Sequence, residues 1–563
     1  MRRTRTPALV AVATALAILA GCSSDGGPSL AEEGPTTTAA ATDGTASPSM
    51  GTGGAHPCDQ GATQDQVATE PVADVASDLT LTSFDDTKIR LHWFPHPDAT
   101  ADDPVPTVLM GPGWSLAGDT SLEGAALFGA LSIPALREAG YNVLTWDPRG
   151  FGESGGNATV NDPSNEGRDL QVILDWVATQ PEAKTDGAGD PRAGMVGFSY
   201  GGGIQLVTAA IDCRVDAIVP GIAWHSLETS LFKSRTVKAG WASILSNTGG
   251  GRVDPHITSA SESGIETGLL SQDDEDWFRS RGPADLVDDI TVPTLFVQGT
   301  VDTLFTLDEA ITNYRSLRER DVPTAMLWFC GGHGTCLTDP GDPDRVTERE
   351  LAWLARYLVG DTTVDVGPRF ETVDQDGTSW VADDLPVADE TLGGQGTGSL
   401  DLTNDSTTGP IQGDPADGDP LAGLVETITP GPASGAVEVP IRVTAALAGH
   451  LALGAPTLSL AYSGTAPAGD QPTRVFAQLL DDERNVVVGN QITPVEVVLD
   501  GKPHTVEIDL EVIAQHLEEG HDLTLQLVAT TTAYATPRLG GQITFDEIGI
   551  SIPVVTSGLT KRG

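Results

Sequence analysis

The sequence predicts an α/β domain that is interrupted by a helical insertion and followed by a β-sandwich. Three observations predict this order. Apolar runs alternate with helix-like segments up to about residue 360, the alternation breaks between about 225 and 290, and short strands with alternating apolar and polar residues follow from residue 437. Strand–helix alternation is typical of a parallel sheet covered by helices. Strands with one apolar and one polar face are typical of a β-sandwich, and the expected sandwich is most like a jelly roll.

The domain limits follow from where these patterns change. The 563 residues exceed what one domain holds. We expect an α/β domain over residues 65–360 with a cap inserted at about 225–290, a connecting region over 361–436, and the β-sandwich over 437–555. The insertion carries apolar residues at helical spacing and is expected to cover a pocket.

The amino terminus predicts export. Arginines stand at positions 2, 3 and 5, the apolar run Ala8 to Ala20 is too short to span a bilayer, and Leu19-Ala20-Gly21-Cys22 resembles a bacterial lipobox. Residues 1–22 are therefore predicted to be a lipoprotein signal peptide with Cys22 lipidated, and 23–64 a flexible Ser/Thr/Gly/Pro stalk. The protein is expected on the outer face of the bacterial cell membrane. An ordinary secretory signal is the alternative.

The charge limits the partners. With 79 acidic and 31 basic residues the formal net charge is −48, and no basic stripe offsets it. Such a surface repels phosphate backbones and anionic lipid headgroups. We therefore expect no nucleic-acid binding, and we expect membrane association through the lipid anchor alone.

A nucleophile motif follows a strand-like run. Ala193 to Val196 leads into Gly197-Phe198-Ser199-Tyr200-Gly201, the G-x-S-x-G pattern, and Ile204 to Ala210 is apolar enough for a buried helix. A serine hydroxyl becomes a useful nucleophile when a sharp strand-to-helix turn exposes it to a base and to free backbone N–H groups. The pattern predicts that Ser199 is such a nucleophile.

An acid and a histidine follow in the order that this motif requires. The strand-like run Thr294 to Gly299 precedes Asp302, and the run Thr324 to Phe329 precedes His333. Open α/β sheets place their sites on loops at the carboxyl ends of strands. We therefore expect His333 to act as the base and Asp302 to orient it. His225 also ends a strand and is assigned to the pocket wall or cap, whereas Asp308 and Asp339 are weaker candidates for the acid.

Longer segments resemble a known family. They are Trp146 to Gly156, Asp175-Trp176-Val177, Gly197 to Gly202, Phe278 to Pro283 and Val292 to Gly299. Together they resemble the peptidase S15 family, which contains Xaa-Pro dipeptidyl-peptidases and cocaine-esterase-like hydrolases. The resemblance implies an α/β-hydrolase domain with a helical cap, followed by a jelly-roll domain. It also implies that Ser199, Asp302 and His333 are nucleophile, acid and base.

The oxyanion loop departs from the family pattern. Where the family usually has a tyrosine after a proline, this chain has Gly111-Pro112-Gly113-Trp114-Ser115, and Pro112 has no N–H to donate. The Tyr200 N–H is expected as one donor. A backbone N–H near Gly113 or Trp114, or the Trp114 indole N–H, is expected as the other. The predicted pocket walls are the cap and the residues Gly113, Trp114, Phe151, Phe198 and Trp224.

The cysteines fit an oxidising exterior. If Cys22 is lipidated, four of the five remain, and Cys330 and Cys336 bracket His333. We expect one disulfide between these two and another between Cys58 and Cys213. Zinc ligation is the competing use of Cys-x-x-His, but it requires four ligands and the sequence offers no second cluster. No metal is therefore expected.

A second glycine motif does not predict a cofactor. Gly150 to Gly155 fits G-x-G-x-x-G and Asp169 follows at a suitable distance, but a dinucleotide site needs a helix to begin within the glycines, and residues 156–163 prolong the loop. The segment is interpreted as a pocket wall, and no cofactor is expected.

These features predict a serine hydrolase that cleaves an ester, an amide or an Xaa-Pro peptide bond in a small molecule or short peptide. A dipeptidase needs carboxylates for the substrate ammonium group, and the cap offers Asp273-Asp274-Glu275-Asp276; a solvated helix start is the other interpretation of this run. The alternative function is a non-catalytic surface-binding lipoprotein that uses the hydrolase fold as a scaffold.

Overall fold

A computed structural model of the chain describes residues 67–73, 75, 77–123, 131–411, 420–467 and 472–562. The expected signal peptide, the lipidated Cys22, the stalk and Cys58 lie outside these residues and stay predictions. Within the described residues, none of the helices combines the length and the apolar character needed to cross a bilayer.

The first domain is built on a twelve-stranded mixed sheet. The middle strands pair in parallel, and both edges are antiparallel. In sheet order the strands are β1 (Thr69–Pro71), β2 (Asp78–Thr82), β3 (Lys88–Phe94), β5 (Asn142–Trp146), β4 (Thr107–Gly111), β8 (Ala193–Phe198), β9 (Val215–Gly221), β12 (Thr294–Gly299), β13 (Thr324–Phe329), β14 (Phe370–Val373), β15 (Ser379–Ala382) and β29 (Thr560–Lys561). A small hairpin, β6 (Thr185–Gly187) and β7 (Asp190–Pro191), stands apart from this sheet.

Helices cover both faces of this sheet, as parallel strands require. The helices are α2 (Ile133–Glu138), α3 (Glu166–Val177), α4 (Tyr200–Ile211), α9 (Leu307–Glu319) and α10 (Arg345–Leu354), which continues as a π-helical turn over Ala355–Val359; a short 3-10 turn spans Val287–Asp289. One apolar core joins the sheet to α3, α4 and α9, and a second joins it to α2 and α10. Every residue of β8 and β12 is buried, because these central strands are covered on both sides.

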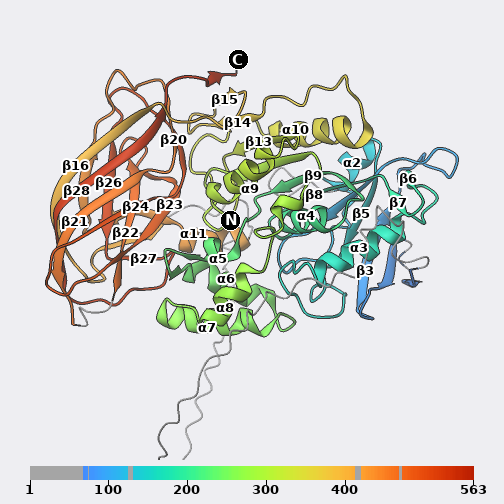
Figure 1. Cartoon of the computed structure of the whole chain (residues 1–563), viewed down its shortest axis with the longest axis horizontal. Helices are drawn as coiled ribbons and strands as arrows, with labels where there is room; N and C mark the ends of the chain where they lie inside the picture. Colours follow the sequence, from blue (N-terminus) through green and yellow to red (C-terminus); the bar gives the residue numbers. More distant parts are fainter. Residues whose placement is uncertain are drawn as a thin grey trace, which may run out of the picture. The chain divides into compact units, whose positions relative to one another are not determined.

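The insertion forms the expected cap of helices and one small hairpin (Figure 1). Its elements are α5 (Leu227–Leu231), β10 (Phe232–Lys233), β11 (Thr236–Val237), α6 (Ala239–Gly249), α7 (Pro255–Thr267) and α8 (Gln272–Arg279). Side-chain caps begin two of the helices, with Asp254 before α7 and Ser271 before α8. Apolar residues of α6, α7 and α8 share one buried cluster with Tyr200 and Trp224.

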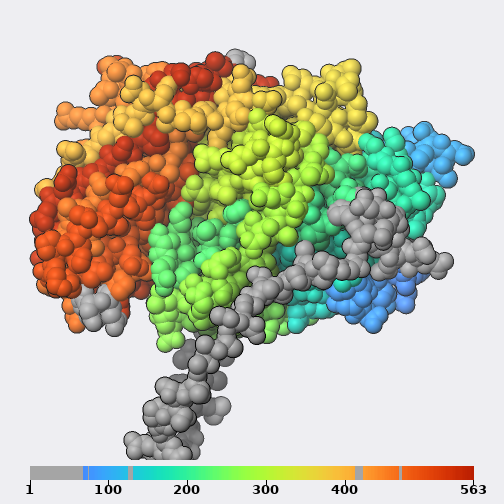
Figure 2. Space-filling model, viewed as in Figure 1, coloured from blue at the N-terminus to red at the C-terminus, as the bar shows by residue number. Residues whose placement is uncertain are grey.

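The carboxyl-terminal domain is a β-sandwich, coloured orange to red in Figures 1 and 2. One sheet has the order β24-β21-β28-β20-β25 with β16 beside β28, a second has the order β19-β26-β22-β23, and β18-β17-β27 form a third, smaller one. Their bounds are β16 (Glu390–Asp401), β17 (Thr407–Pro410), β18 (Pro430–Ser434), β19 (Val437–Ile441), β20 (Leu451–Gly454), β21 (Thr457–Thr465), β22 (Thr473–Asp481), β23 (Val486–Val497), β24 (His504–Asp509), β25 (Ile513–His516), β26 (Leu523–Val528), β27 (Thr530–Thr531) and β28 (Gln542–Val555). One apolar core fills the space between the two larger sheets. The predicted fold class is confirmed.

The segment 361–436 does more than connect the domains. β14 and β15 extend the large sheet, β16 pairs with β28, and a helix, α11 (Pro420–Ile428), contacts α6 of the cap. β16 lacks apolar alternation because three of its glycines lie against β19, a strand of the other large sheet, which supplies the apolar side chains at this contact (Val437, Val439 and Ile441).

Candidate active site

Ser199 stands on the sharp turn between β8 and α4. Its backbone φ of 57° and ψ of −117° lie outside the regions that side chains prefer, and α4 begins at the next residue. The turn needs the close approach of two glycines, since a Cβ on Gly201 would lie 2.2 Å from the carbonyl oxygen of Gly111. This geometry is that of a nucleophile elbow.

The structure brings the three predicted residues together. His333 lies on the loop after β13, with its Nε2 2.8 Å from the Ser199 Oγ. Its Nδ1 lies 2.8 Å from the Asp302 Oδ2 on the loop after β12. A carboxylate at Nδ1 favours the tautomer that carries its proton there, which leaves Nε2 free to accept the serine proton.

The Asp302 carboxylate is fully buried and held from two sides. Its second oxygen accepts the backbone N–H groups of Leu304 at 2.9 Å and Phe305 at 2.8 Å. The Thr303 hydroxyl donates to the His333 carbonyl at 2.9 Å and so joins the acid loop to the histidine loop. We define the acid loop as residues 300–306 and the histidine loop as residues 330–336. The two loops are therefore joined by two hydrogen bonds, one from the Thr303 hydroxyl and one between the imidazole and Asp302.

The imidazole is enclosed by aromatic rings and a disulfide. Trp241 of the cap and Phe305 meet its ring edge-on, with centroids 5.7 and 5.1 Å away. The expected bridge between Cys330 and Cys336 closes the histidine loop, with Cα atoms 5.5 Å apart. Cys213 is also disulfide-bonded. Its expected partner, Cys58, lies outside the described residues.

One predicted oxyanion donor is engaged elsewhere. The Trp114 indole N–H donates to the Leu245 carbonyl of α6 at 3.0 Å, because the cap helix lies within reach of this ring. The indole is therefore not free to face an oxyanion. The Tyr200 N–H belongs to the first turn of α4, where N–H groups have no partner within the helix. That donor and the backbone N–H groups of Gly113 and Trp114 stay predictions.

An apolar cavity opens beside Ser199. Its volume, counted as the space open to the centre of a water molecule, is about 90 Å³. Among the described residues that line it, none carries a charged side chain. They include Trp114, Trp224, Phe278, Leu304 and Phe305, together with aliphatic residues and two serines, Ser246 and Ser261, of α6 and α7. The two hydroxyl groups bond to each other at 2.6 Å, and Ser246 also donates to a helix carbonyl.

Three of the predicted pocket residues do not line the cavity. Phe198 packs on Phe329 in the core beneath α2 and α10, because its position in β8 directs its side chain to that face of the sheet. Phe151 stands behind the wall, edge-on to Trp114 and Tyr200, and supports both rings without lining the cavity. Gly113 is likewise absent from the lining, whereas Trp224 and Trp114 are part of it.

The acidic run of the cap does not face the cavity. Asp274 accepts the Ser271 hydroxyl and lies 3.0 Å from the His256 imidazole, and Asp276 pairs with Arg279 at 2.6 Å. These contacts are those of a helix start, which was one of the two interpretations of this run. His225 bonds to Asn313 at 2.8 Å and has no part in the site.

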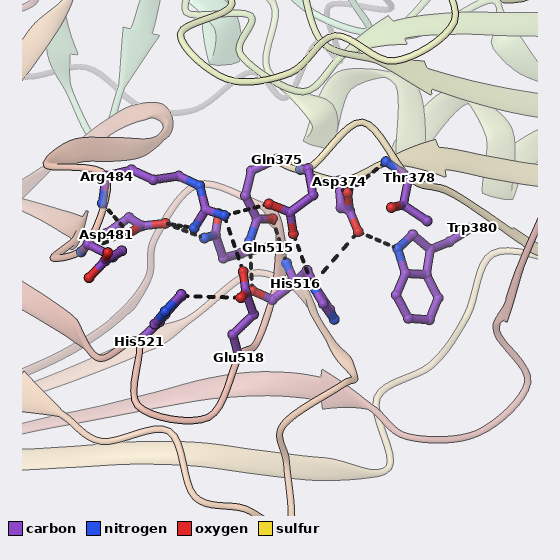
Figure 3. A network of polar contacts seen from close by, with 12 residues as sticks. Asp374, Gln375, Thr378, Trp380, Asp481, Arg484, Gln515, His516, Glu518 and His521 are labelled. Atoms are coloured by element: carbon purple, nitrogen blue, oxygen red, sulfur yellow. Dashed lines mark hydrogen bonds and ion pairs between the residues drawn. The ribbon is translucent and has the colours of Figure 1, made fainter.

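Two further sets of residues have features of a binding site. One was noted in the sequence, and the other is a cluster seen in the structure. Asp169, the residue at the ribose-acid position, is paired with Arg149 at 2.7 Å. Asp374, Asp376 and His516 have ligand atoms within 4.8 Å of one another (Figure 3). However, Asp374 accepts the Trp380 indole N–H at 2.7 Å and Asp376 pairs with Arg484. These carboxylates are thus engaged within a polar network between the two domains.

Sequence reasoning missed a buried lysine at the site. Lys238 of the cap is 3% exposed, and its Nζ donates to the carbonyl oxygens of Thr303 and Leu304, each at 3.0 Å. Burial lowers its pKa. No motif signals this role, because the lysine and the acid loop are distant in sequence and meet only after folding.

Comparison with known proteins agrees with this architecture. The model of the X-Pro dipeptidyl-peptidase (S15) family matches residues 86–335, from the start of β3 to the histidine loop. The resemblance to the S15 family is confirmed over this range. Because the matched range contains Ser199, Asp302 and His333, these three positions fall within the region that the family shares.

Solved structures extend the likeness in fold to most of the chain. A CocE/NonD family hydrolase from Staphylococcus aureus has a TM-score of 0.62 at 13% identity, over 89% of this chain and 98% of that one. An aminopeptidase from a marine sediment Thaumarchaeota archaeon has a TM-score of 0.63 at 13% identity, over 88% and 100%. The shared fold therefore includes the β-sandwich as well as the S15-like domain.

Curated relatives match a shorter stretch. The uncharacterized 31.7 kDa protein in the traX-finO intergenic region of Escherichia coli is 36% identical over 90 residues, which are 16% of this chain and 30% of that protein. This chain thus spans less than a third of that relative's length. The S15 match and the shared fold together support a hydrolase.

Proposed function

We propose that the chain is an exported, membrane-tethered serine hydrolase that cleaves esters or amides of uncharged, apolar acyl groups. The observation that carries the proposal is the pair of 2.8 Å contacts that link Ser199, His333 and Asp302 beside an apolar cavity. The tether rests on the lipobox-like Leu19-Ala20-Gly21-Cys22 alone.

The proposed chemistry is acyl transfer to water in two halves. Ser199 Oγ bonds to the substrate carbonyl carbon as its proton passes to His333 Nε2, and the Tyr200 N–H and a backbone N–H near Gly113 stabilise the oxyanion. The bond to the leaving group then breaks, and His333 returns the proton to it. Water attacks the acyl-enzyme by the same route, which releases the acid and restores Ser199.

The lining of the cavity favours an uncharged acyl group. A dipeptidase must bind a protonated amino terminus, and a buried ammonium group without a counter-charge is strongly disfavoured. The described lining offers no carboxylate, and the acidic run Asp273 to Asp276 is used at the start of α8. Esters or amides with an aliphatic or aromatic acyl chain therefore fit this site better than an Xaa-Pro peptide.

A substrate panel tests the proposal. We expect the purified protein to hydrolyse p-nitrophenyl butyrate faster than Ala-Pro-p-nitroanilide, and the Ser199→Ala variant to lose the ester activity by a factor of about 10³ or more. Anilide turnover that exceeds ester turnover and depends on Ser199 would contradict the substrate class. Absence of any Ser199-dependent turnover would favour the surface-binding lipoprotein instead.

A further inference from the structure

The β-sandwich directs two side-chain amides at the loops that carry the triad. Both come from β23, whose Gly489 and Asn490 have backbone φ angles of 63° and 56°. This conformation bends the strand locally. The next residue, Gln491, then lies against the acid loop, while Asn490 lies against the histidine loop.

Gln491 makes a direct, buried hydrogen bond to the backbone of Asp302. Gln491 Nε2 donates to the Asp302 carbonyl at 2.8 Å, and both residues are buried, with exposed fractions of 9% and 0%. The carboxylate of Asp302 is already held by Leu304 and Phe305 from its own loop. The β-sandwich therefore supplies the bond that fixes the backbone of the acid itself.

Asn490 contacts the histidine loop and does not contact His333 itself. Asn490 Nδ2 donates to the Thr335 carbonyl at 2.9 Å, two residues beyond His333. A third contact joins the same two parts of the chain, because the Thr306 hydroxyl donates at 2.9 Å to Glu511 of the β-sandwich. The acid loop and the histidine loop thus each meet a separate side chain of the second domain.

We propose that Gln491 and Asn490 are positioning residues, so that the β-sandwich forms part of the catalytic machinery. The inference rests on the proposed function. Neither side chain lines the cavity or contacts a triad side chain, so neither is a catalytic residue. Both hold the loops that carry Asp302 and His333 and so determine the positions of these two side chains. Displacement of a catalytic group by about 1 Å is enough to lower the rate by about 10²-fold.

The principal test is the Gln491→Met variant, which keeps the length of the side chain but cannot donate a hydrogen bond. With p-nitrophenyl butyrate we expect kcat to fall by about 10- to 100-fold while KM stays within about twofold of wild type. KM is expected to hold because the cavity lining is unchanged. A kcat within about twofold of wild type in the folded variant would overturn the proposal.

A matched control lies in a different contact between the two domains. Gln375 Nε2 donates to the His516 carbonyl and its Oε1 accepts the His516 N–H, both at 2.8 Å (Figure 3). Gln375→Met removes these two amide-to-backbone bonds, and Gln375 forms no hydrogen bond to the triad loops through its side chain. We expect a lower melting temperature and an unchanged kcat. An equal loss of kcat in both variants would assign the effect to domain docking in general and would contradict the proposal.

A second variant covers the case in which Gln491→Met does not fold. Asn490→Gly preserves the positive φ and removes the amide, so we expect a folded protein with reduced kcat and faster amide hydrogen exchange in residues 330–336. Unchanged exchange and unchanged kcat in Asn490→Gly would overturn the proposal. A wild-type protein without Ser199-dependent turnover would refute the proposed function instead, and the exchange measurement would still report whether β23 holds the loops.

Discussion

At the scale of single residues, the site depends on how Asp302 is held. Its carboxylate is fully buried, yet both oxygens are hydrogen-bonded, one to two backbone N–H groups and the other to the imidazole. Gly332 has a φ of 103° and passes so close that a Cβ there would lie 2.7 Å from the carboxylate. The acid is therefore fixed by its own loop and by the neighbour of the base.

We predict that Asp302→Asn lowers kcat by about 10³- to 10⁴-fold, because an amide at this position favours the wrong imidazole tautomer. Ester hydrolysis by the purified variant measures the effect. Asp339→Asn is the control, since that carboxylate caps its own turn through the Gly341 N–H. It is expected to stay within about twofold of wild type. Equal losses in the two variants would show that Asp302 has no special role.

The grouping of Ser199, Asp302 and His333 could be predicted because each residue follows a strand, and parallel strands end at one edge of a sheet. The surroundings of the triad could not be predicted in the same way. Phe198 faces α2 and α10 because of the pleat of β8, and the Trp114 indole is engaged by a cap carbonyl. Which helices cover that face of β8, and which carbonyl the indole meets, depend on how segments distant in sequence pack together.

At the scale of elements, the strands and helices of the first domain follow closely from apolar periodicity. The predicted runs at Thr294 to Gly299 and Thr324 to Phe329 coincide with β12 and β13. These strands are buried throughout or nearly so, which makes their sequences continuous apolar runs. The local sequence was sufficient to predict these strands. Burial on both faces requires a continuous apolar run, whichever helices and strands lie beside it.

The elements after residue 360 were harder to predict for a physical reason. β16 is rich in glycine and obtains its partner from β28, more than a hundred residues later. β29 joins the large sheet beside β15 from the far end of the chain. A strand that is stabilised by a distant partner need not show alternation of its own. The segment 361–436 therefore has the composition of a linker although much of it is ordered in sheets.

At the scale of the whole molecule, a buried ionic group joins the cap, the acid loop and the β-sandwich. Glu511 is 2% exposed and lies 3.2 Å from the Lys233 ammonium of the cap. Burial alone would raise its pKa, but the charges of Lys233 and Lys238 and the bond from Thr306 hold that pKa below its usual value. The ionised form of Glu511 therefore stabilises the folded chain.

We predict that Glu511→Gln lowers the free energy of unfolding by about 3–5 kcal/mol at about pH 7, because the lysines lose their buried counter-charge. A carboxyl with a lowered folded pKa stabilises above its unfolded pKa, and this contribution is lost as pH falls through the folded pKa. The difference between wild type and variant should thus narrow at about pH 4 and below. Urea unfolding at the two pH values measures it.

Glu496→Gln provides the comparison for that experiment. Glu496 pairs with Arg474 at 2.9 Å, but its side chain is 43% exposed, so its loss should cost less than about 1 kcal/mol at either pH. A Glu511→Gln variant that is as stable as Glu496→Gln at about pH 7 would contradict the assignment of a stabilising buried pair.

The central claim is that Ser199 is the nucleophile, and covalent labelling tests it most directly. The folded protein would be treated with a serine-directed aryl phosphonate and digested, and the adduct located by mass spectrometry. The account predicts one adduct, on the peptide that contains Ser199, and its loss in Ser199→Ala and in His333→Ala, since the base is needed to activate the hydroxyl. A folded wild-type protein that is not labelled, or a Ser199→Ala variant labelled at the same rate, would contradict it.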